Sequence, residues 1–279
     1  MGRFARVRAR TWLVVGVVAV AVSVAGAVAY AATQPAIQTF TPRSADQITN
    51  IDVLRQQIRN YYGDPLGTGT FAPESNYARE ASFVAKQGDL WLNARAHAHG
   101  QGQKAILLDV DDTTLATYNY EIASNWAFNP ATNGTFVTNQ AFPAVPGMVD
   151  MVENAAREGY AIFFLTGRGA AQEPATLGNL TSDGVGVDAG YPAPTTLNDG
   201  EDGLFTKPAV ADYPAYLQAA CAGDPNGSCT TIHYKSATRA HIEALGYDIV
   251  ANFGDQFSDL EGGHADKTFK LPNPNYFLP

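Results

Sequence analysis

Three carboxylates follow a short apolar run in the middle of the chain. Residues 105–108 are Ala-Ile-Leu-Leu, and Asp109, Asp111 and Asp112 come directly after them. Acids at the end of a buried strand are costly to bury unless they share a cation or a proton. Taken alone, Asp111 or Asp112 capping a turn explains the run equally well. Open α/β sheets bind their ligands at the carboxyl ends of strands, so the run also indicates a reaction centre.

Three later apolar runs end in the same way, with a hydroxyl, an ammonium or a carboxylate soon after the last apolar residue. These side chains are Thr166, Lys235, Asp255 and Asp259. Each has a structural explanation when taken singly, as a cap, a solvated charge or a pair of acids that opens a helix. Together, and in this order, they can stabilise the charge of a magnesium-bound phosphoryl group during its transfer. The set therefore predicts phosphoryl-transfer chemistry.

The elements that must position these side chains alternate along the chain. The predicted strands are residues 105–109, 161–165, 230–234 and 248–253. The predicted helices are residues 45–62, 76–96, 147–158 and 236–245. This alternation predicts an α/β fold with a Rossmann-like parallel sheet covered by helices. Residues 116–146 and 181–210 do not fit the repeat, and such insertions often carry lids or substrate contacts.

The first 31 residues have the composition of an export signal. Four arginines and no acid lie in residues 1–10, and residues 11–33 carry no charge. The sequence Ala29-Tyr30-Ala31 offers a cleavage site. The apolar run approaches the length of about 20 residues that spans a bilayer, so an uncleaved membrane anchor is the alternative. Residues 32–44 then form a linker, and residues 45–279 form the catalytic domain.

Both a cleaved signal and an uncleaved anchor place the domain outside the cytoplasm, because the arginines of residues 1–10 stay on the cytoplasmic side of the membrane. We therefore expect a secreted or extracytoplasmic protein, or one held at the outer face of the cytoplasmic membrane. Without residues 1–31 the chain has 14 basic and 27 acidic residues, a formal charge of −13. Such a charge argues against a nucleic-acid polymer as partner.

The two cysteines lie on either side of a turn-rich segment. Cys221 and Cys229 flank Ala-Gly-Asp-Pro-Asn-Gly-Ser, which can bring them together. An exported protein meets an oxidising environment, in which disulfides persist. We therefore predict a disulfide between them, with two free thiols as the alternative.

The order of the chemical groups resembles the four motifs of the haloacid dehalogenase (HAD) superfamily. The matching segments are Asp109-x-Asp111-x-Thr113, Thr166, Lys235 and Gly254-Asp255-x-x-x-Asp259. Residues 234–239 and 270–276 are similar to its secreted acid phosphatase branch, subfamily IIIB or class B, which includes plant vegetative storage proteins. The resemblance covers residues 45–279. It implies a HAD-like domain with N-terminal helices in residues 45–100 and a small cap insertion in residues 116–146.

This resemblance implies a magnesium-dependent acid phosphatase that hydrolyses small phosphomonoesters through an aspartyl-phosphate. Asp109 would attack phosphorus, and Asp111 would protonate the leaving alcohol and later deprotonate water. Thr166 and Lys235 would bind the phosphoryl oxygens. The implied Mg²⁺ ligands are the Asp109 carboxylate, the Asp111 backbone carbonyl, Asp255 and Asp259, the last directly or through water.

Neighbouring residues receive lesser roles from the same resemblance. Asp112 is expected to support the site or cap a turn, and Arg168 to support its loop. A non-catalytic storage or binding protein on this scaffold is one alternative, and a phosphotransferase or phosphomutase is another. Asp111 argues against dehalogenation, which needs no acid two residues past the nucleophile.

Residues 116–146 also hold four aromatic side chains that could serve the site. Tyr118, Tyr120, Trp126 and Phe128 could stack on an aromatic leaving group or pack a small cap. Stacking and burial give the same pattern in a sequence, and we favour packing.

Overall fold

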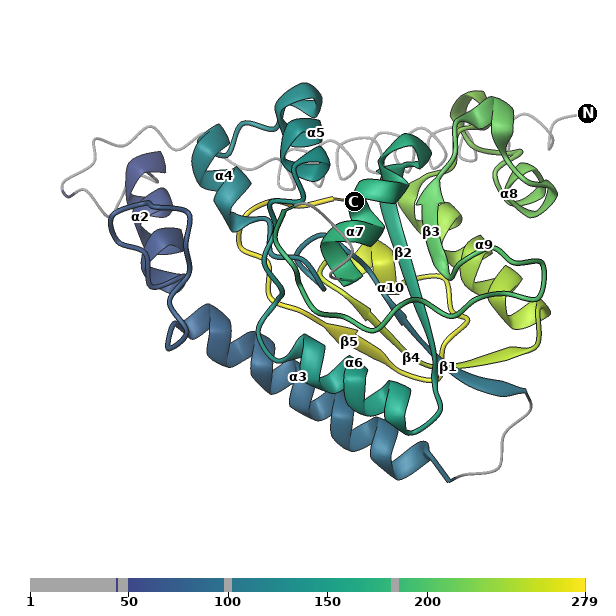
Figure 1. The fold of residues 1–279 in the computed structure, drawn as a ribbon. Helices are drawn as coiled ribbons and strands as arrows, with labels where there is room; N and C mark the ends of the chain where they lie inside the picture. The colour runs from purple at the N-terminus through teal and green to yellow at the C-terminus, as the bar shows by residue number, and fades with distance from the viewer. Residues whose placement is uncertain (1–43, 45–49, 98–101, 182–185, 279) are drawn as a thin grey trace, which may run out of the picture. The chain divides into compact units, whose positions relative to one another are not determined.

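The fold is described by a computed structural model that covers residues 44, 50–97, 102–181 and 186–278 (Figure 1). The predicted signal peptide or anchor and nearly all of the linker lie outside these residues. Among the helices of the described part, none is both long and apolar enough to cross a membrane.

The centre of the domain is a sheet of five parallel strands in the order β3-β2-β1-β4-β5. The strands are β1 (Gln103–Leu108), β2 (Ala161–Gly169), β3 (Leu204–Lys207), β4 (Tyr247–Gly254) and β5 (Thr268–Lys270). The predicted α/β fold with a parallel sheet is confirmed.

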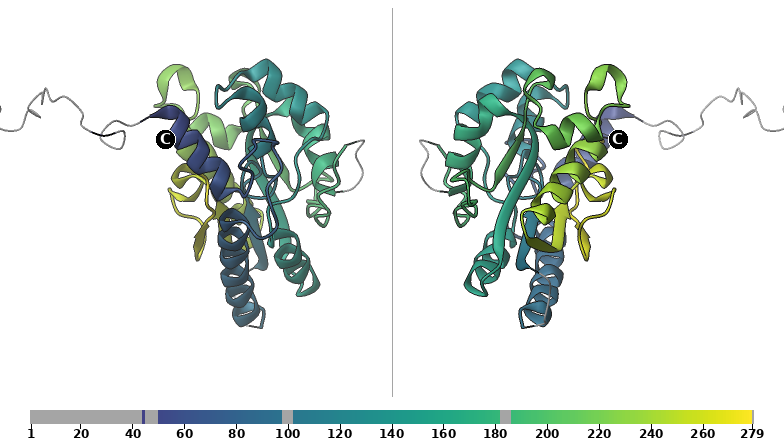
Figure 2. Two further views of the ribbon diagram at one scale, coloured as in Figure 1. Left: turned by 90° about the vertical axis from the view of Figure 1, so that its left-hand side faces the viewer. Right: turned by 90° about the vertical axis from the view of Figure 1, so that its right-hand side faces the viewer.

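Side chains of the central strands alternate between two hydrophobic cores, as the pleat of a strand requires. Ile106 and Leu108 pack in the larger core, which includes residues of α3 (Asn76–Arg95) and α6 (Met148–Arg157). Ala105 and Leu107 pack in the smaller core with residues of α8 (Ala215–Ala220) and α9 (Thr231–Ala244). Helices therefore cover both faces of the sheet, and α3 and α6 run side by side on one of them (Figures 1 and 2).

The remaining helices lie mainly around the carboxyl ends of the strands or at the start of the domain. They are α2 (Ile51–Tyr61), α4 (Tyr118–Ser124), α5 (Pro130–Thr138), α7 (Glu173–Thr181) and α10 (Phe257–Leu260). Short 3₁₀ turns occupy Ala170–Gln172, Val210–Asp212 and Pro225–Gly227. The insertion at residues 116–146 thus contains α4 and α5.

One glycine inside a helix has a packing reason. Gly88 lies in α3, where glycine is intrinsically unfavourable. A Cβ atom at this position would lie 2.5 Å from the Phe253 ring, a severe clash. Glycine therefore lets α3 pack closely against β4.

The prediction of a strand at residues 230–234 was wrong, because these residues form the N-cap and first turn of α9. Thr230 caps α9 by accepting a hydrogen bond from the His233 amide at 3.2 Å. Tyr234, Thr238 and Ile242 are buried on one face of the helix at a spacing of four residues. Burial at helical spacing outweighs the local β propensity of residues 231–234, so the segment is helical.

The sheet also contains two strands that the sequence did not predict. β3 lies inside residues 181–210, which we expected to be an irregular insertion, and β5 follows the loop after α10. Both are short, with four and three residues. Strands this short on the two edges of a sheet leave little periodicity to detect. β2 also continues to Gly169, beyond the predicted end at residue 165.

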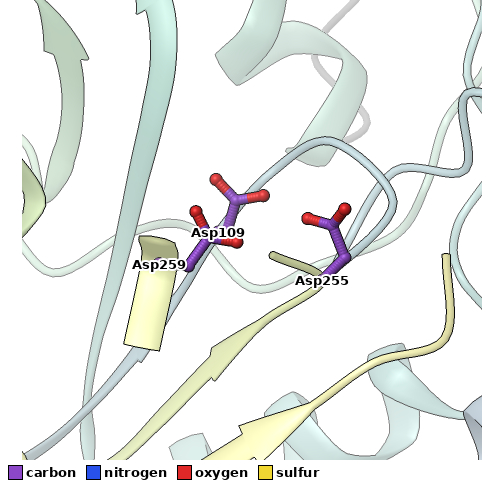
Figure 3. A group of neighbouring side chains, drawn as sticks. All are labelled: Asp109, Asp255 and Asp259. Carbon is purple, nitrogen blue, oxygen red and sulfur yellow. The ribbon is translucent and has the colours of Figure 1, made fainter. Parts of the chain in front are cut away.

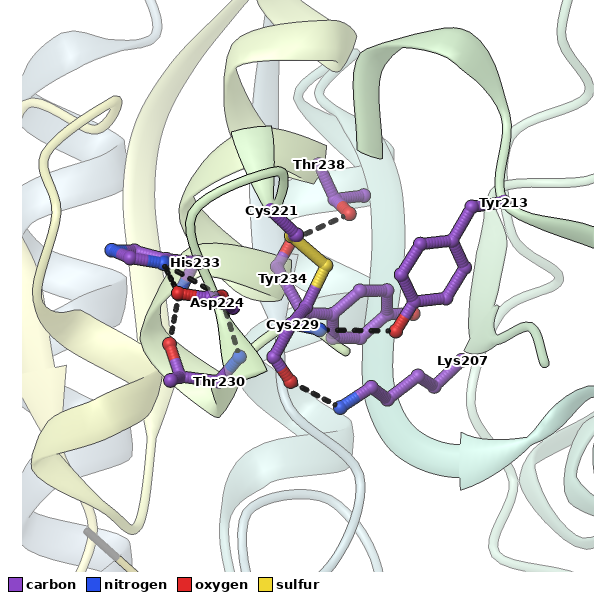
Figure 4. Close-up of a disulfide and its surroundings, with 9 residues drawn as sticks. All are labelled: Lys207, Tyr213, Cys221, Asp224, Cys229, Thr230, His233, Tyr234 and Thr238. Carbon is purple, nitrogen blue, oxygen red and sulfur yellow. Dashed lines mark hydrogen bonds and ion pairs between the residues drawn. A yellow bond between two sulfur atoms is a disulfide. The ribbon is translucent and has the colours of Figure 1, made fainter. Parts of the chain in front are cut away.

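The predicted disulfide between Cys221 and Cys229 is present and lies directly before α9 (Figure 4). Both cysteines are buried in the smaller core. The Cys229 carbonyl accepts a hydrogen bond from Lys207 at 2.8 Å, and its amide donates to the Tyr213 hydroxyl at 3.3 Å. The closed loop therefore fixes the start of the helix that carries Lys235.

Candidate active site

Three carboxylates meet at the carboxyl ends of β1 and β4 (Figure 3). Asp109 directly follows β1, Asp255 directly follows β4, and Asp259 lies in α10. One oxygen from each lies within 4.8 Å of the others, and all three residues are buried. The Asp109 amide donates to the Phe253 carbonyl at 2.9 Å, which ties the two strand ends together. Asp255 precedes α10, and Asp259 lies within it.

Lys235 brings a single ammonium to this cluster from α9. Its Nζ donates to Asp109 Oδ1 and, at 2.5 Å, to Asp259 Oδ1. Burial alone would lower the pKa of Lys235, but the charges of Asp109 and Asp259 raise it above its usual range. Lys235 therefore stays protonated and holds the two carboxylates.

The cluster carries more negative charge than one ammonium neutralises. Burial raises the pKa of Asp109 well above its usual range, against the lowering effect of Lys235. Burial, together with the charges of Asp259 and Asp112, raises the pKa of Asp255 to about 7. Three buried carboxylates around one point, short of positive charge, are the oxygen donors that a hard divalent cation prefers. The residues present therefore fit a divalent metal ion.

Side-chain amides orient Asp255, and a backbone amide orients Asp259. Asp255 Oδ2 accepts hydrogen bonds at 2.6 Å from both Gln256 Nε2 and Asn273 Nδ2. Asp259 Oδ2 accepts a hydrogen bond from the backbone N–H of Gln256 at 2.8 Å. Neutral donors fix these oxygens without adding a positive charge that would compete with a cation.

Asp111 points its carboxylate at Arg168 of β2. The guanidinium donates to both carboxylate oxygens, from Nη2 at 2.6 Å and from Nε at 3.1 Å. Its remaining nitrogen donates to Thr176 Oγ1 at 3.1 Å. A bidentate pair of this kind sets the direction of the carboxylate. Arg168 thus supports Asp111, a contact that the sequence did not predict.

Asp112 closes the turn after β1. It is fully buried with a positive φ of 53°, and it accepts hydrogen bonds from the Thr117 amide at 2.9 Å and the Thr117 hydroxyl at 2.6 Å. Burial raises its pKa to about 7 although the bonds from Thr117 oppose the shift. The contacts are those of a turn cap.

Thr166 lies in β2, next to β1, and is 1 % exposed. Its Oγ1 accepts a hydrogen bond from the Arg168 amide at 3.1 Å. A cavity lies at the strand ends. Gly167 and Arg168 line it, and Thr166 is not among the described residues that do so. In this arrangement the Thr166 hydroxyl organises the backbone that carries Arg168.

The carboxylates of the cluster, together with Asp111, Arg168 and Lys235, line a cavity of about 560 Å³. Charged residues from the strand ends line one part of it. The insertion and the C-terminal segment supply apolar residues to another part, namely Trp126, Phe128, Tyr276, Phe277 and Leu278. The four aromatic residues of the insertion that could serve the site therefore divide: Tyr118 and Tyr120 are buried in the larger core, whereas Trp126 and Phe128 line the cavity.

Sequence analysis gave no role to several residues that hold the site together, although residues 234–239 and 270–276, which contain Arg239 and Asn273, carried the family resemblance. Arg239 is fully buried and donates to the backbone carbonyls of Asp259 and Gly263, both at 2.7 Å, so it holds the segment around α10. Asn273 and Gln256 orient Asp255, as described above. Each acts through backbone or amide contacts that only the fold creates.

Comparison with known proteins identifies the family. Residues 27–279 match the family model described as HAD superfamily, subfamily IIIB (acid phosphatase), so the chain belongs to this family. It is accordingly a phosphatase, an enzyme of the phosphomonoester hydrolase class.

Characterised relatives include both enzymes and storage proteins. Acid phosphatase 1 of Solanum lycopersicum is 25 % identical over 76 % of this chain and 71 % of its own length. Vegetative storage protein 2 of Arabidopsis thaliana is 24 % identical over 83 % of this chain and 76 % of its own length. The class C acid phosphatase from Bacillus anthracis with tungstate bound shares the fold, with a TM-score of 0.58 and 19 % identity, covering 82 % of this chain and 87 % of that one.

Proposed function

We propose that this protein hydrolyses phosphomonoesters through a covalent intermediate on Asp109. The observation that carries the proposal is the setting of the Asp109 carboxylate. It lies at the cavity against the Lys235 ammonium, beside Asp255 and Asp259, and two residues before the carboxylate that Arg168 directs.

The chain's own groups supply the nucleophile and the acid and base of a balanced two-step reaction. An Asp109 oxygen attacks phosphorus, the bond from phosphorus to the ester oxygen breaks, and protonated Asp111 gives its proton to the departing alcohol. In the second step water attacks phosphorus while Asp111 takes a proton from it. The bond from phosphorus to Asp109 then breaks, which releases orthophosphate and restores the carboxylate.

Lys235 and the backbone near the end of β2 would neutralise and orient the phosphoryl group. The Lys235 ammonium can contact a phosphoryl oxygen while it still offsets the charge of Asp109. Thr166 would act through the segment from Gly167 to Arg168 or by donating its own hydroxyl. A storage role alone does not require an ammonium buried against two carboxylates, so this pair favours catalysis.

We further propose Mg²⁺ as the ion that the acidic cluster holds. Asp109, Asp255, the Asp111 backbone carbonyl and Asp259, directly or through water, are the proposed ligands. The ion would supply positive charge to the phosphoryl oxygens. All these donors are oxygens, which suits magnesium.

The Asp109→Asn variant tests the nucleophile. We expect kcat for p-nitrophenyl phosphate to fall by more than about 10³-fold, because the amide cannot form the covalent intermediate. Asp150→Asn, a change on the surface of α6, is the matched control and should keep full activity. The assay is run with Mg²⁺ and with chelator. Undiminished turnover in Asp109→Asn, with circular dichroism unchanged, would remove Asp109 from this role.

A further inference from the structure

Glu121 is a buried carboxylate that the proposed reaction does not use. It lies in α4, is 7 % exposed and lines the cavity. Within the described part of the chain, no side chain or amide donates a hydrogen bond to its carboxylate, and no base forms an ion pair with it. Every other charged residue that lines the cavity in that part has a partner.

The basic residues of the cavity are engaged elsewhere. Arg168 uses all three of its nitrogens on Asp111 and Thr176. Lys235 is held by two carboxylates, and Lys207 donates to the Cys229 carbonyl. Within the described residues, none of these three bases forms an ion pair with Glu121. Glu121 lines the cavity without a partner among the described residues, so its position favours a ligand that brings positive charge.

The position of Glu121 assigns it to the leaving group. Glu121 and Asp111 line the same cavity, and Asp111 is the group that would protonate the ester oxygen. Burial raises the pKa of Glu121 to about 7, and the charge of Asp111 adds to this shift. A substituent close to the ester oxygen would therefore approach Glu121.

We propose that Glu121 binds a positively charged nitrogen of the leaving group, so that phosphate esters of amino alcohols are preferred substrates. This inference rests on the proposed function, because Asp111 defines where the ester oxygen lies. An ammonium would donate charge-assisted hydrogen bonds to Glu121 and offset a cavity lined by five acids and three bases. A leaving group with a second phosphate would be repelled.

The test compares two phosphonates that the protein cannot hydrolyse. They are 2-aminoethylphosphonate and 2-hydroxyethylphosphonate, which differ mainly in an ammonium against a hydroxyl. Binding is measured by isothermal titration calorimetry in the presence of Mg²⁺ for the wild type, Glu121→Gln and Glu158→Gln. Glu158 is exposed at the end of α6, so it is a matched control.

We expect the wild type and Glu158→Gln to bind the amine about tenfold more tightly than the alcohol. The preference should fall to near unity in Glu121→Gln, with its melting temperature recorded to show that it folds. Equal affinity of the wild type for both ligands, or a preference retained in Glu121→Gln, would overturn the inference. Because binding needs no turnover, this outcome is separate from the Asp109→Asn assay, which decides the proposed function.

Discussion

The cavity has two walls that differ in how firmly their side chains are held. The charged wall consists of Asp109, Asp111, Arg168, Lys235, Asp255 and Asp259. Each of its members is fixed by an ion pair or by amide donors. The apolar wall consists of Trp126, Phe128, Tyr276, Phe277 and Leu278, and both Phe128 and Phe277 are more than two-thirds exposed.

This difference assigns catalysis to the charged wall and the choice of substrate to the apolar wall. Charges that stabilise a transition state act best when they are held in place beforehand. Exposed side chains on an insertion and at a chain end can differ between proteins without disturbing those charges. We therefore expect changes in the charged wall to affect kcat and stability, and changes in the apolar wall to affect the choice of substrate.

The largest effect is expected for Lys235→Gln, in the charged wall. The variant leaves Asp109 and Asp259 buried without their ammonium, which costs about 3–5 kcal/mol of folding stability at neutral pH. We also expect kcat to fall by about 10²- to 10³-fold. Urea unfolding and steady-state kinetics measure the two effects, with Lys86→Gln, an exposed change on α3, as control. Unchanged stability would mean that the pair does not hold the wall together.

Lys235 also marks the limit of what the sequence predicts. The acids that end β1 and β4 were predictable in position, because an apolar run followed by Asp gives the strand and its end together. The residue type of Lys235 was recognised in the sequence, but its element was not, since Thr231 to Tyr234 have strand-like propensity and become helical through capping and burial. The order of the polar groups along the chain can be read directly from the sequence. The contacts of Arg168, Asn273 and Arg239 cannot be read in this way, because they join segments far apart in the chain.

A second prediction concerns the link between Arg168 and Asp111 in the charged wall. Arg168→Gln should lower kcat by about 10²-fold with a smaller change in KM, since Arg168 positions Asp111. A double-mutant cycle with Asp111→Asn is the decisive measurement. If Arg168 acts through Asp111, the double variant should be little worse than Asp111→Asn alone. Fully additive losses would show that Arg168 works on the substrate independently.

A third prediction uses the raised pKa values of buried acids in and near the charged wall. Burial raises the pKa of Asp255 and of Asp112 to about 7, above the values near 4 expected in the unfolded chain. Between these values the folded state binds more protons, so stability falls as pH rises from about 4 to 7. Each group contributes up to about 1.4 kcal/mol per pH unit.

The measurement is thermal unfolding in chelator at pH 5, 6, 7 and 8. The melting temperature of Asp255→Asn should depend less on pH than that of the wild type. Added Mg²⁺ should stabilise the wild type more at pH 8 than at pH 5, because protons compete with the ion for the same carboxylates. A wild-type melting temperature that does not change with pH would contradict the assignment of these protons.

The smallest effect is expected for Phe128→Ala, in the apolar wall. Phe128 is 70 % exposed and its ring contacts that of Tyr120 edge to face, so its loss should hardly change folding stability. An aromatic leaving group would lose contact with the ring, which raises KM for p-nitrophenyl phosphate by about threefold. KM for glycerol 2-phosphate should not change. Phe83→Ala, a change at a 63 % exposed phenylalanine on α3 outside the cavity, is the matched control. A fall in kcat as large as that of Lys235→Gln would erase the distinction between the two walls, because an exposed ring would then contribute to the chemistry itself.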